Sequence, residues 1–209
     1  MRIAIDGPAG AGKTAVGRAL AREFGYRFVS TGKMYRAVAL AFDRGLALDA
    51  VRIDVTEDER FFVNGEDVTD RLHTPEYDDK SSQVAVRPDV RSMLVARQRE
   101  IAERGDIVME GRDIGTVVLP DADVKLFLLA SPEVRAARRV AQRGGTDKYA
   151  ATLRELERRD DRDEGRAIAP LKAARDATII DTDRKTLVEV ISAASNLVRE
   201  RLEKRCHGG

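Results

Sequence analysis

The segment GPAGAGKT, residues 7–14, has the spacing of a phosphate-binding loop, G-x-x-x-x-G-K-[ST]. Glycines at this spacing let the backbone curve so that several N–H groups point at one anion. Lys13 can reach the β- and γ-phosphates of a nucleoside triphosphate, and the Thr14 hydroxyl can ligate the accompanying Mg²⁺. The alternative, a glycine-rich turn without a ligand, is disfavoured because a predicted strand precedes the loop and a predicted helix follows it. Thr14 is therefore the expected metal ligand, and the expected ATP-binding residues are Gly7, Pro8, Ala9, Gly10, Ala11, Gly12, Lys13 and Thr14.

A second candidate is the run ERRDDRDEGR, residues 157–166, which has no apolar residue. If the run is helical, four charged residues fall at positions i, i+3, i+4 and i+7 and share one face: Arg159, Arg162, Asp163 and Arg166. Three guanidiniums beside one carboxylate suit a surface that closes over phosphates, because arginine binds phosphate oxygens bidentately. The charges that fit an ordinary solvated face are Arg158, Asp161 and Glu164.

The surrounding sequence predicts the elements that position these residues. Short apolar segments are typical of buried strands, and they cover residues 2–6, 26–30, 107–111, 124–130 and 178–182. Helical spacing or helix caps indicate helices at residues 14–25, 33–45, 131–145 and 186–204. Strands that alternate with helices predict an α/β fold of three layers, in which a parallel sheet is covered by helices on both faces.

Two segments interrupt this alternation within an expected single domain. Residues 49–77 contain Asn64-Gly65 between β-forming residues, a strong hairpin signal, and predict a small antiparallel β insert. Residues 146–170 contain the charged run, follow a Gly-Gly pair and predict a short, movable helical lid. Gly165 weakens its helix, so we expect the helix to end or fray near Arg166. The core then comprises residues 1–48, 78–145 and 171–209.

Composition limits the other possibilities. The net charge of +1 gives no global field to attract nucleic acid or membranes, and no apolar run approaches the roughly 20 residues of a membrane helix. The single cysteine, Cys206, excludes an intrachain disulfide and indicates a reducing compartment, and the two histidines have no metal-ligand spacing. We expect a cytoplasmic monomer with no nucleic-acid or membrane partner.

Further motifs narrow the kind of phosphate-loop protein. A GTPase needs Asp-x-x-Gly and Asn-Lys-x-Asp motifs, which the chain lacks, and the strand IVMEG leads into Arg112-Asp113 rather than ending in the Asp of a DNA or transport ATPase. The motifs GPAGAGKT, STGKMYRAVAL, SSQVA, EGRDIGTVV and RDDRDEGRAIAPL together resemble the bacterial cytidylate (CMP) kinase family, in its order and over nearly the whole chain. The resemblance implies a P-loop NTPase fold with a five-stranded parallel sheet, a monophosphate-binding insert and a lid. It also implies Mg²⁺-dependent phosphoryl transfer from ATP to CMP or dCMP, the two expected substrates.

The resemblance assigns roles to individual residues. Ser82, Arg91 and Asp113 would read the base, and a carboxylate can accept a hydrogen bond from the cytosine amino group, which uracil lacks. Thr31, where the family often has serine, and Arg36 would hold the CMP phosphate. The implied CMP-binding residues are Thr31, Tyr35, Arg36, Ser82, Arg91, Arg112, Asp113, Arg159, Asp163 and Arg166. The implied catalytic residues are Lys13, Arg112, Arg162 and Arg166.

Some of these residues have plainer alternatives. Tyr35 suits ordinary core packing, Arg36 suits the surface, and Asp113 suits a Mg²⁺ contact through water. The helix that begins near residue 132 carries three arginines for which ATP contact and a solvated face are equally weighted, and we assign no role to Arg135, Arg138 and Arg139.

Two other functions stay open on the sequence. A kinase for another small substrate, such as AMP, is disfavoured by the Asn-Gly insert and by SSQVA. A regulatory module that binds nucleotide without turnover is disfavoured by Lys13, Thr14 and the arginine stripe. ADP release measured with each nucleoside monophosphate discriminates among the three.

Overall fold

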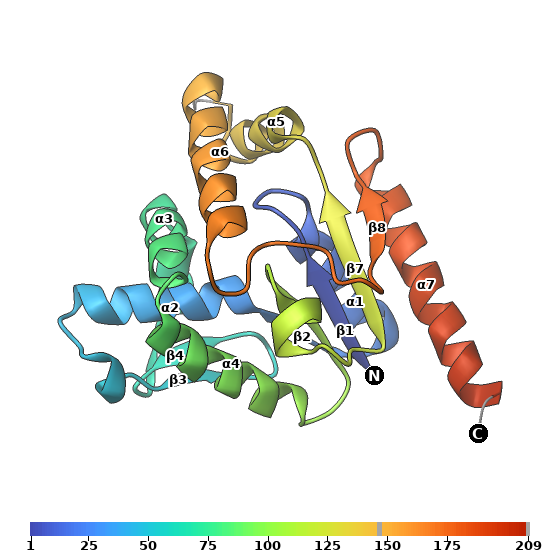
Figure 1. Cartoon of the computed structure of the whole chain (residues 1–209), viewed down its shortest axis with the longest axis horizontal. Helices are drawn as coiled ribbons and strands as arrows, with labels where there is room; N and C mark the ends of the chain where they lie inside the picture. The colour runs from blue at the N-terminus through green and yellow to red at the C-terminus, as the bar shows by residue number, and fades with distance from the viewer. Residues whose placement is uncertain (146–147, 208–209) are drawn as a thin grey trace.

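A computed structural model describes residues 1–145 and 148–207 of the 209-residue chain. At its centre is a parallel sheet with the strand order β2-β6-β1-β7-β8 (Figure 1). The five strands are β1 Arg2–Asp6, β2 Arg27–Ser30, β6 Ile107–Glu110, β7 Val124–Leu129 and β8 Thr178–Asp181. All five lie within the predicted segments, and the predicted five-stranded parallel sheet is confirmed.

Helices cover both faces of this sheet, as predicted. They are α1 Lys13–Phe24, α2 Thr31–Asp43, α3 Pro75–Val84, α4 Pro88–Ala102, α5 Pro132–Gln142, α6 Tyr149–Gly165 and α7 Leu187–His207. Ile3 and Ile5 of β1 pack with α1 and α7, whereas Ala4 packs with α2 and α4. This alternation follows from the period of two in a strand, and it gives the sheet one hydrophobic core on each side.

Helix α4 corrects the sequence prediction, in which no helix was expected between residues 78 and 106. It has Pro88 at its first turn and buries Val90, Leu94 and Ile101, spaced for one helix face. The buried and exposed faces of α4 differ little in polarity, because the buried face also contains two polar residues, Arg91 and Gln98. Those two positions make the apolar periodicity harder to recognise in the sequence.

The predicted antiparallel insert is present. Its three-stranded sheet consists of β3 Ile53–Val55, β4 Phe61–Val63 and β5 Glu66–Asp67. Asn64 and Gly65 have φ values of 51° and 86°, which is the left-handed pair that a two-residue hairpin turn requires. Figure 1 shows the insert beside α2, at the end of the molecule opposite α7. Helix α3 runs across the limit between residues 77 and 78 that was expected to end the insert.

The predicted lid contains α6, which lies beside α5 and above α3 (Figure 1). Residues 146 and 147, at the start of the predicted lid, lie outside the described residues. The helix ends at Gly165, as expected from the cost of glycine in a helix. Arg166 follows it in an extended conformation, with φ −66° and ψ 136°, so of the four charged residues assigned to one face only Arg159, Arg162 and Asp163 lie on the helix.

Three short turns complete the described chain: η1 Leu48–Ala50, η2 Thr69–His73 and the π-helical turn η3 Ile114–Val118. Across residues 1–145 and 148–207, no helix is long and apolar enough to span a membrane.

Candidate active site

The predicted phosphate loop joins β1 to α1 at the carboxyl edge of the sheet. Gly7 has φ 145°, and a Cβ atom there would lie 2.2 Å from the Leu128 carbonyl oxygen, so only glycine fits this crossing. Gly12 caps the amino end of α1, whose free N–H groups and dipole favour an anion. The Lys13 side chain is buried and its Nζ donates to the Pro8 carbonyl oxygen at 2.7 Å, so it lies within the loop.

Burial changes the protonation of this lysine. Desolvation, and then repulsion from Arg112, lower the pKa of Lys13 from 10.5 to about 7. An anion bound in the loop would reverse this effect, because it stabilises the ammonium form.

The predicted metal ligand Thr14 lies next to a carboxylate to which the sequence assigned no role. Glu110 Oε1 accepts hydrogen bonds from the Thr14 and Ser30 hydroxyls at 2.8 and 2.7 Å. Glu110 ends β6, which pairs with the phosphate-loop strand β1, and P-loop NTPases place a metal-binding acid at such a position. This strand position is the signal that could have identified Glu110.

A hydroxyl and a carboxylate at this position fit Mg²⁺. The ion keeps several waters and takes only one or two protein ligands beside substrate phosphates. Within the described ranges, three or more His, Cys, Asp or Glu side chains nowhere gather into a metal cage, and this kind of Mg²⁺ site needs none.

Above the loop is a cleft of about 630 Å³. Arginines from several elements line it, namely Arg18 of α1, Arg36 of α2, Arg112 after β6, Arg138 and Arg139 of α5, and Arg159 of α6. Burial, followed by repulsion from Arg112, lowers the pKa of Arg159 to about 10. The crowding of guanidiniums makes the cleft a site for polyanions.

The lid stripe is divided by the structure. Asp163 is buried and accepts a hydrogen bond from Arg112 Nε at 2.7 Å, and Arg159 faces the cleft beside it. Arg162 instead reaches α3, where its Nη2 donates to Asp79 at 2.5 Å. Arg166 was expected on an exposed lid, but its residue is only 9% exposed.

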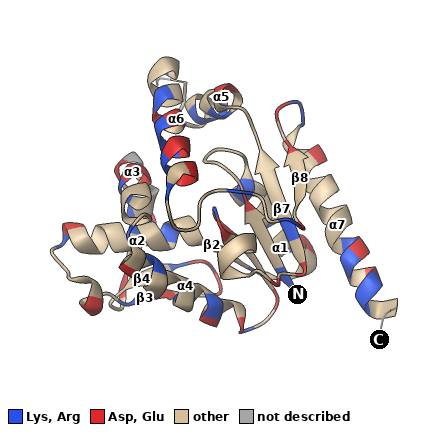
Figure 2. Ribbon diagram, in the orientation of Figure 1, with Lys and Arg blue, Asp and Glu red and all other residues tan. Residues whose placement is uncertain are grey.

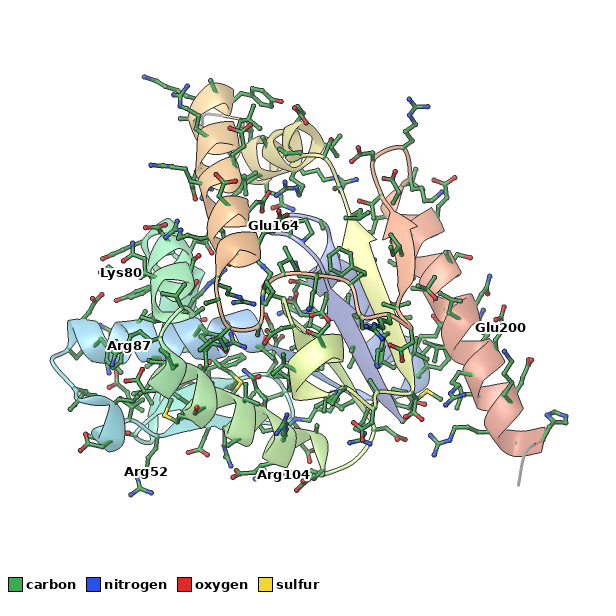
Figure 3. The ribbon with its side chains drawn as sticks, in the orientation of Figure 1. Arg52, Lys80, Arg87, Arg104, Glu164 and Glu200 are labelled. Atoms are coloured by element: carbon green, nitrogen blue, oxygen red, sulfur yellow. The ribbon has the colours of Figure 1, made fainter. Side chains whose placement is uncertain are left out.

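The charges predicted to be solvated are indeed exposed. Arg158, Asp161 and Glu164 are all exposed, and Figure 3 labels Glu164 near the carboxyl end of α6. Figure 2 shows acidic and basic residues intermixed on this helix, so the sign of the charge does not distinguish its buried face from its exposed face.

The residues expected to read a base form a buried cluster. Asp113 and Arg91 are 5% and 3% exposed and form an ion pair, and Arg166 Nη2 lies 3.6 Å from Asp113 Oδ1. Arg91 Nη1 donates to the Tyr35 hydroxyl at 3.4 Å. The Ser82 hydroxyl is buried and has no hydrogen-bond partner among the residues that the structure describes. A buried hydroxyl without a partner can be satisfied by a polar ligand.

The expected phosphate-binding residues Thr31 and Arg36 both belong to α2, and Arg36 lines the cleft. The Thr31 hydroxyl donates to the Glu110 carbonyl oxygen at 2.8 Å, at the carboxyl end of β6. Arg36 donates from Nη1 to the Leu72 carbonyl oxygen at 2.9 Å, and its Nη2 pairs with Asp78. Arg36 is therefore half-buried at the cleft rather than a free surface residue.

Asp6, to which the sequence assigned no role, fixes the segment after Arg112-Asp113. Its two carboxylate oxygens accept from the backbone N–H groups of Ile114 and Gly115 at 2.8 and 2.7 Å. Burial raises the pKa of Asp6 to about 6. The carboxylate holds η3, and therefore the start of the base cluster, against the phosphate-loop strand.

The arginines of α5 are not a solvated face. Arg135 is 2% exposed, donates to the carbonyl oxygens of Ala9 and Ala130, and pairs with Asp160 of α6. Arg138 donates to Thr182. Arg135 therefore links the phosphate loop, α5 and the lid. This role could not be recognised from the sequence, because the three segments are far apart in the chain.

A phosphate loop on the central strand, an arginine-lined cleft and a lid over a parallel sheet of this order define the class of the protein as a P-loop kinase. Solved structures agree on the fold. A gluconokinase from Sinorhizobium meliloti 1021 covers 100% of this chain and 97% of its own, with TM-score 0.57 and 19% identity. A shikimate kinase from Bacteroides thetaiotaomicron covers 97% and 98%, with TM-score 0.54 and 16% identity.

Sequence comparison places the chain within this class. The family model described as cytidylate kinase matches residues 3–200. The chain is 48% identical to a cytidylate kinase from Mycobacterium leprae (strain Br4923), with 95% of this chain and 96% of that protein covered. It is 43% identical to one from Geobacillus sp. (strain WCH70), with 97% and 98% covered. The chain belongs to the cytidylate kinase family.

Proposed function

We propose that this chain transfers the γ-phosphoryl group of ATP to CMP or dCMP and releases ADP. The observation that carries the proposal is the buried Arg91–Asp113 pair, which directly follows Arg112 of the arginine-lined phosphate cleft; the buried Ser82 hydroxyl, which has no partner among the described residues, supports it. The cytidylate kinases of Mycobacterium leprae and Geobacillus, which match over nearly their full lengths, support the same activity.

The reaction needs positioning and charge neutralisation more than covalent help from the protein. An oxygen of the CMP phosphate forms a bond to the γ-phosphorus, and the bond to the ADP oxygen breaks. The CMP phosphate is mostly ionised at neutral pH, so no general base is needed. Lys13, Arg112 and Arg159 lie around the space where the two phosphate chains would meet, and their charges offset the repulsion between the substrates.

The base cluster accounts for a cytosine preference. The Asp113 carboxylate can accept from the cytosine N4 amino group, whereas uracil presents an acceptor at that position. A buried carboxylate facing an acceptor would lose its hydrogen bond, and buried sites reject such mismatches strongly. Arg166 of the lid segment lies next to Asp113 and would therefore couple recognition of the base to the position of the lid.

Mg²⁺ is the proposed cofactor, held at Thr14 with Glu110 behind it. When bound it neutralises charge on the β- and γ-phosphates. The protein's own part is to keep the Thr14 hydroxyl oriented, and Glu110 does this by accepting a hydrogen bond from it at 2.8 Å.

A coupled assay of ADP release tests the proposal. With Mg²⁺ and ATP, we expect turnover with CMP and dCMP and less than about one-hundredth of that kcat/KM with UMP or AMP, the discrimination that a buried polar mismatch gives. Release only with AMP, or equal rates with UMP and CMP, would exclude the assignment. The single cysteine supports a reducing, cytoplasmic location, and sedimentation velocity tests the predicted monomer.

A further inference from the structure

The carboxylate of Asp78 lies where arginines from three elements converge. Asp78 is in the first turn of α3, and its side chain is 11% exposed. Its Oδ1 accepts from Arg36 of α2, its Oδ2 accepts from Arg139 of α5, and Arg159 Nη1 of the lid lies 3.8 Å from Oδ1. One carboxylate therefore holds together the core, the helix before the lid and the lid itself.

This cluster has more donors and more positive charge than one carboxylate can match. The Nε groups of Arg36, Arg139 and Arg159 are all buried, and none has a hydrogen-bond partner within the described part of the chain. Three guanidiniums share the Asp78 carboxylate here, and Arg159 has a second carboxylate, Asp163, 4.0 Å from its Nε. All three arginines line the phosphate cleft. Such an excess of buried donors fits a phosphate dianion, which has three strong acceptor oxygens.

Asp78 and a substrate phosphate compete for the same donors. Both terminal nitrogens of Arg36 are occupied, Nη1 by the Leu72 carbonyl oxygen and Nη2 by Asp78. A phosphate that binds the terminal nitrogens of Arg36 therefore competes with Asp78 for Nη2. Carboxylates and phosphates are bound by the same planar fork of N–H groups, so one can replace the other without rebuilding the site.

We propose that Asp78 is a positioning residue that stands in for the CMP phosphate in the substrate-free enzyme and is displaced when CMP binds. The proposal rests on the proposed role of Arg36 and Arg159 in binding the monophosphate. Asp78 keeps three like charges assembled when no substrate is present, and as an internal competitor it weakens the binding of the phosphate. Removing its charge should then strengthen the binding of CMP but not of cytidine, which has no phosphate.

The test is isothermal titration of Asp78→Asn with CMP and with cytidine, with the phosphate loop saturated by ADP so that no turnover occurs. We expect CMP to bind about tenfold more tightly than to the wild type, since a like charge beside the phosphate is removed. Cytidine affinity should stay within about twofold, because the nucleoside does not reach the cluster.

Glu76→Gln is the matched control. Glu76 is in the same first turn of α3 and loses the same charge, but it pairs with Lys80 at 2.7 Å. Lys80 lies on the side of α3 turned away from the cleft (Figure 3). Glu76→Gln should bind CMP and cytidine like the wild type. If so, the tighter CMP binding of Asp78→Asn does not come merely from the loss of one negative charge on α3.

Thermal unfolding gives a second, independent measurement. Without ligand, Asp78→Asn should be less stable than the wild type because the arginines lose their shared counter-ion. CMP should narrow that difference, since its phosphate replaces the missing charge. If Asp78→Asn does not fold without ligand, Asp78→Ser is titrated in its place. A variant that folds only when CMP is present also supports the proposal.

Weaker or unchanged CMP binding in the folded variant would overturn the proposal, and so would an equal gain for CMP and cytidine. Failure of the proposed function has a different signature, because the wild type itself would then show no CMP-dependent ADP release.

Discussion

Binding of ATP to the phosphate loop should take up a proton at Lys13. This side chain is buried and its pKa is lowered to about 7 by desolvation and by Arg112. At pH 8 it is then neutral in about 90% of molecules. Bound ATP brings negative charge to within a few ångströms, and one unit charge at 4 Å is worth about 4 kcal/mol in a partly solvated site. That is about three pKa units, enough to make the lysine fully charged at pH 8.

The expected uptake is therefore about 0.9 proton per ATP at pH 8 and about 0.5 at pH 7. It is measured by titrating MgATP without CMP in buffers of different ionisation enthalpy, where the slope of observed against ionisation enthalpy gives the number of protons. The higher pH is chosen because the pKa of Asp6 is raised to about 6 by burial and would contribute at lower pH.

Lys13→Arg is the control for this measurement. The guanidinium keeps the positive charge but does not deprotonate in this range, so its uptake should fall to about zero. Uptake below about 0.2 proton at pH 8 in the wild type, or the same uptake in the arginine variant, would refute the assignment of the proton to Lys13.

Three further substitutions test other parts of the site. Glu110→Gln should raise the Mg²⁺ concentration for half-maximal activity about tenfold, because it removes the charge behind Thr14; an unchanged Mg²⁺ dependence counts against that role. Asp113→Asn should lower the ratio of kcat/KM for CMP over UMP about 100-fold. Because it breaks the buried pair with Arg91, the same substitution should lower the free energy of unfolding, measured by urea titration, by about 3 kcal/mol. Arg166→Ala should lower kcat about 10³-fold in steady-state assays while circular dichroism shows a folded protein; an unchanged kcat would remove Arg166 from the site.

The sheet and the phosphate loop could be predicted from the sequence because their signals are local. Short apolar runs next to glycine turns specify buried parallel strands, and Asn64-Gly65 specifies its hairpin through left-handed backbone angles. Helix α4 escaped prediction for the converse reason. It places Arg91 and Gln98 in the interior, at positions where the apolar pattern would need hydrophobic residues.

The arginines of the site were easier to anticipate than their counter-ions. The stripe on the lid follows from helical spacing alone, and Arg159 and Asp163 do face inward. Which carboxylate pairs with which arginine depends on distances between elements far apart in the chain. Asp78 had no local signal of this kind, and the pairs of Arg162 with Asp79 and Arg135 with Asp160 were likewise unpredictable.

These counter-ions bear on how the lid is positioned before substrates arrive. Its helix is joined to α3 through Arg162–Asp79, to α5 through Asp160–Arg135, and to the loop after β6 through Asp163–Arg112. Each link pairs an arginine with a carboxylate from a different element, so the lid is held in place without nucleotide. Two of the three links use acidic residues of the lid itself, which keeps Arg159 at the cleft while the lid is held from its flanks. The charged run therefore orients the lid with its acidic residues, and it places Arg159 at the cleft, where the sequence predicted contact with the nucleotides.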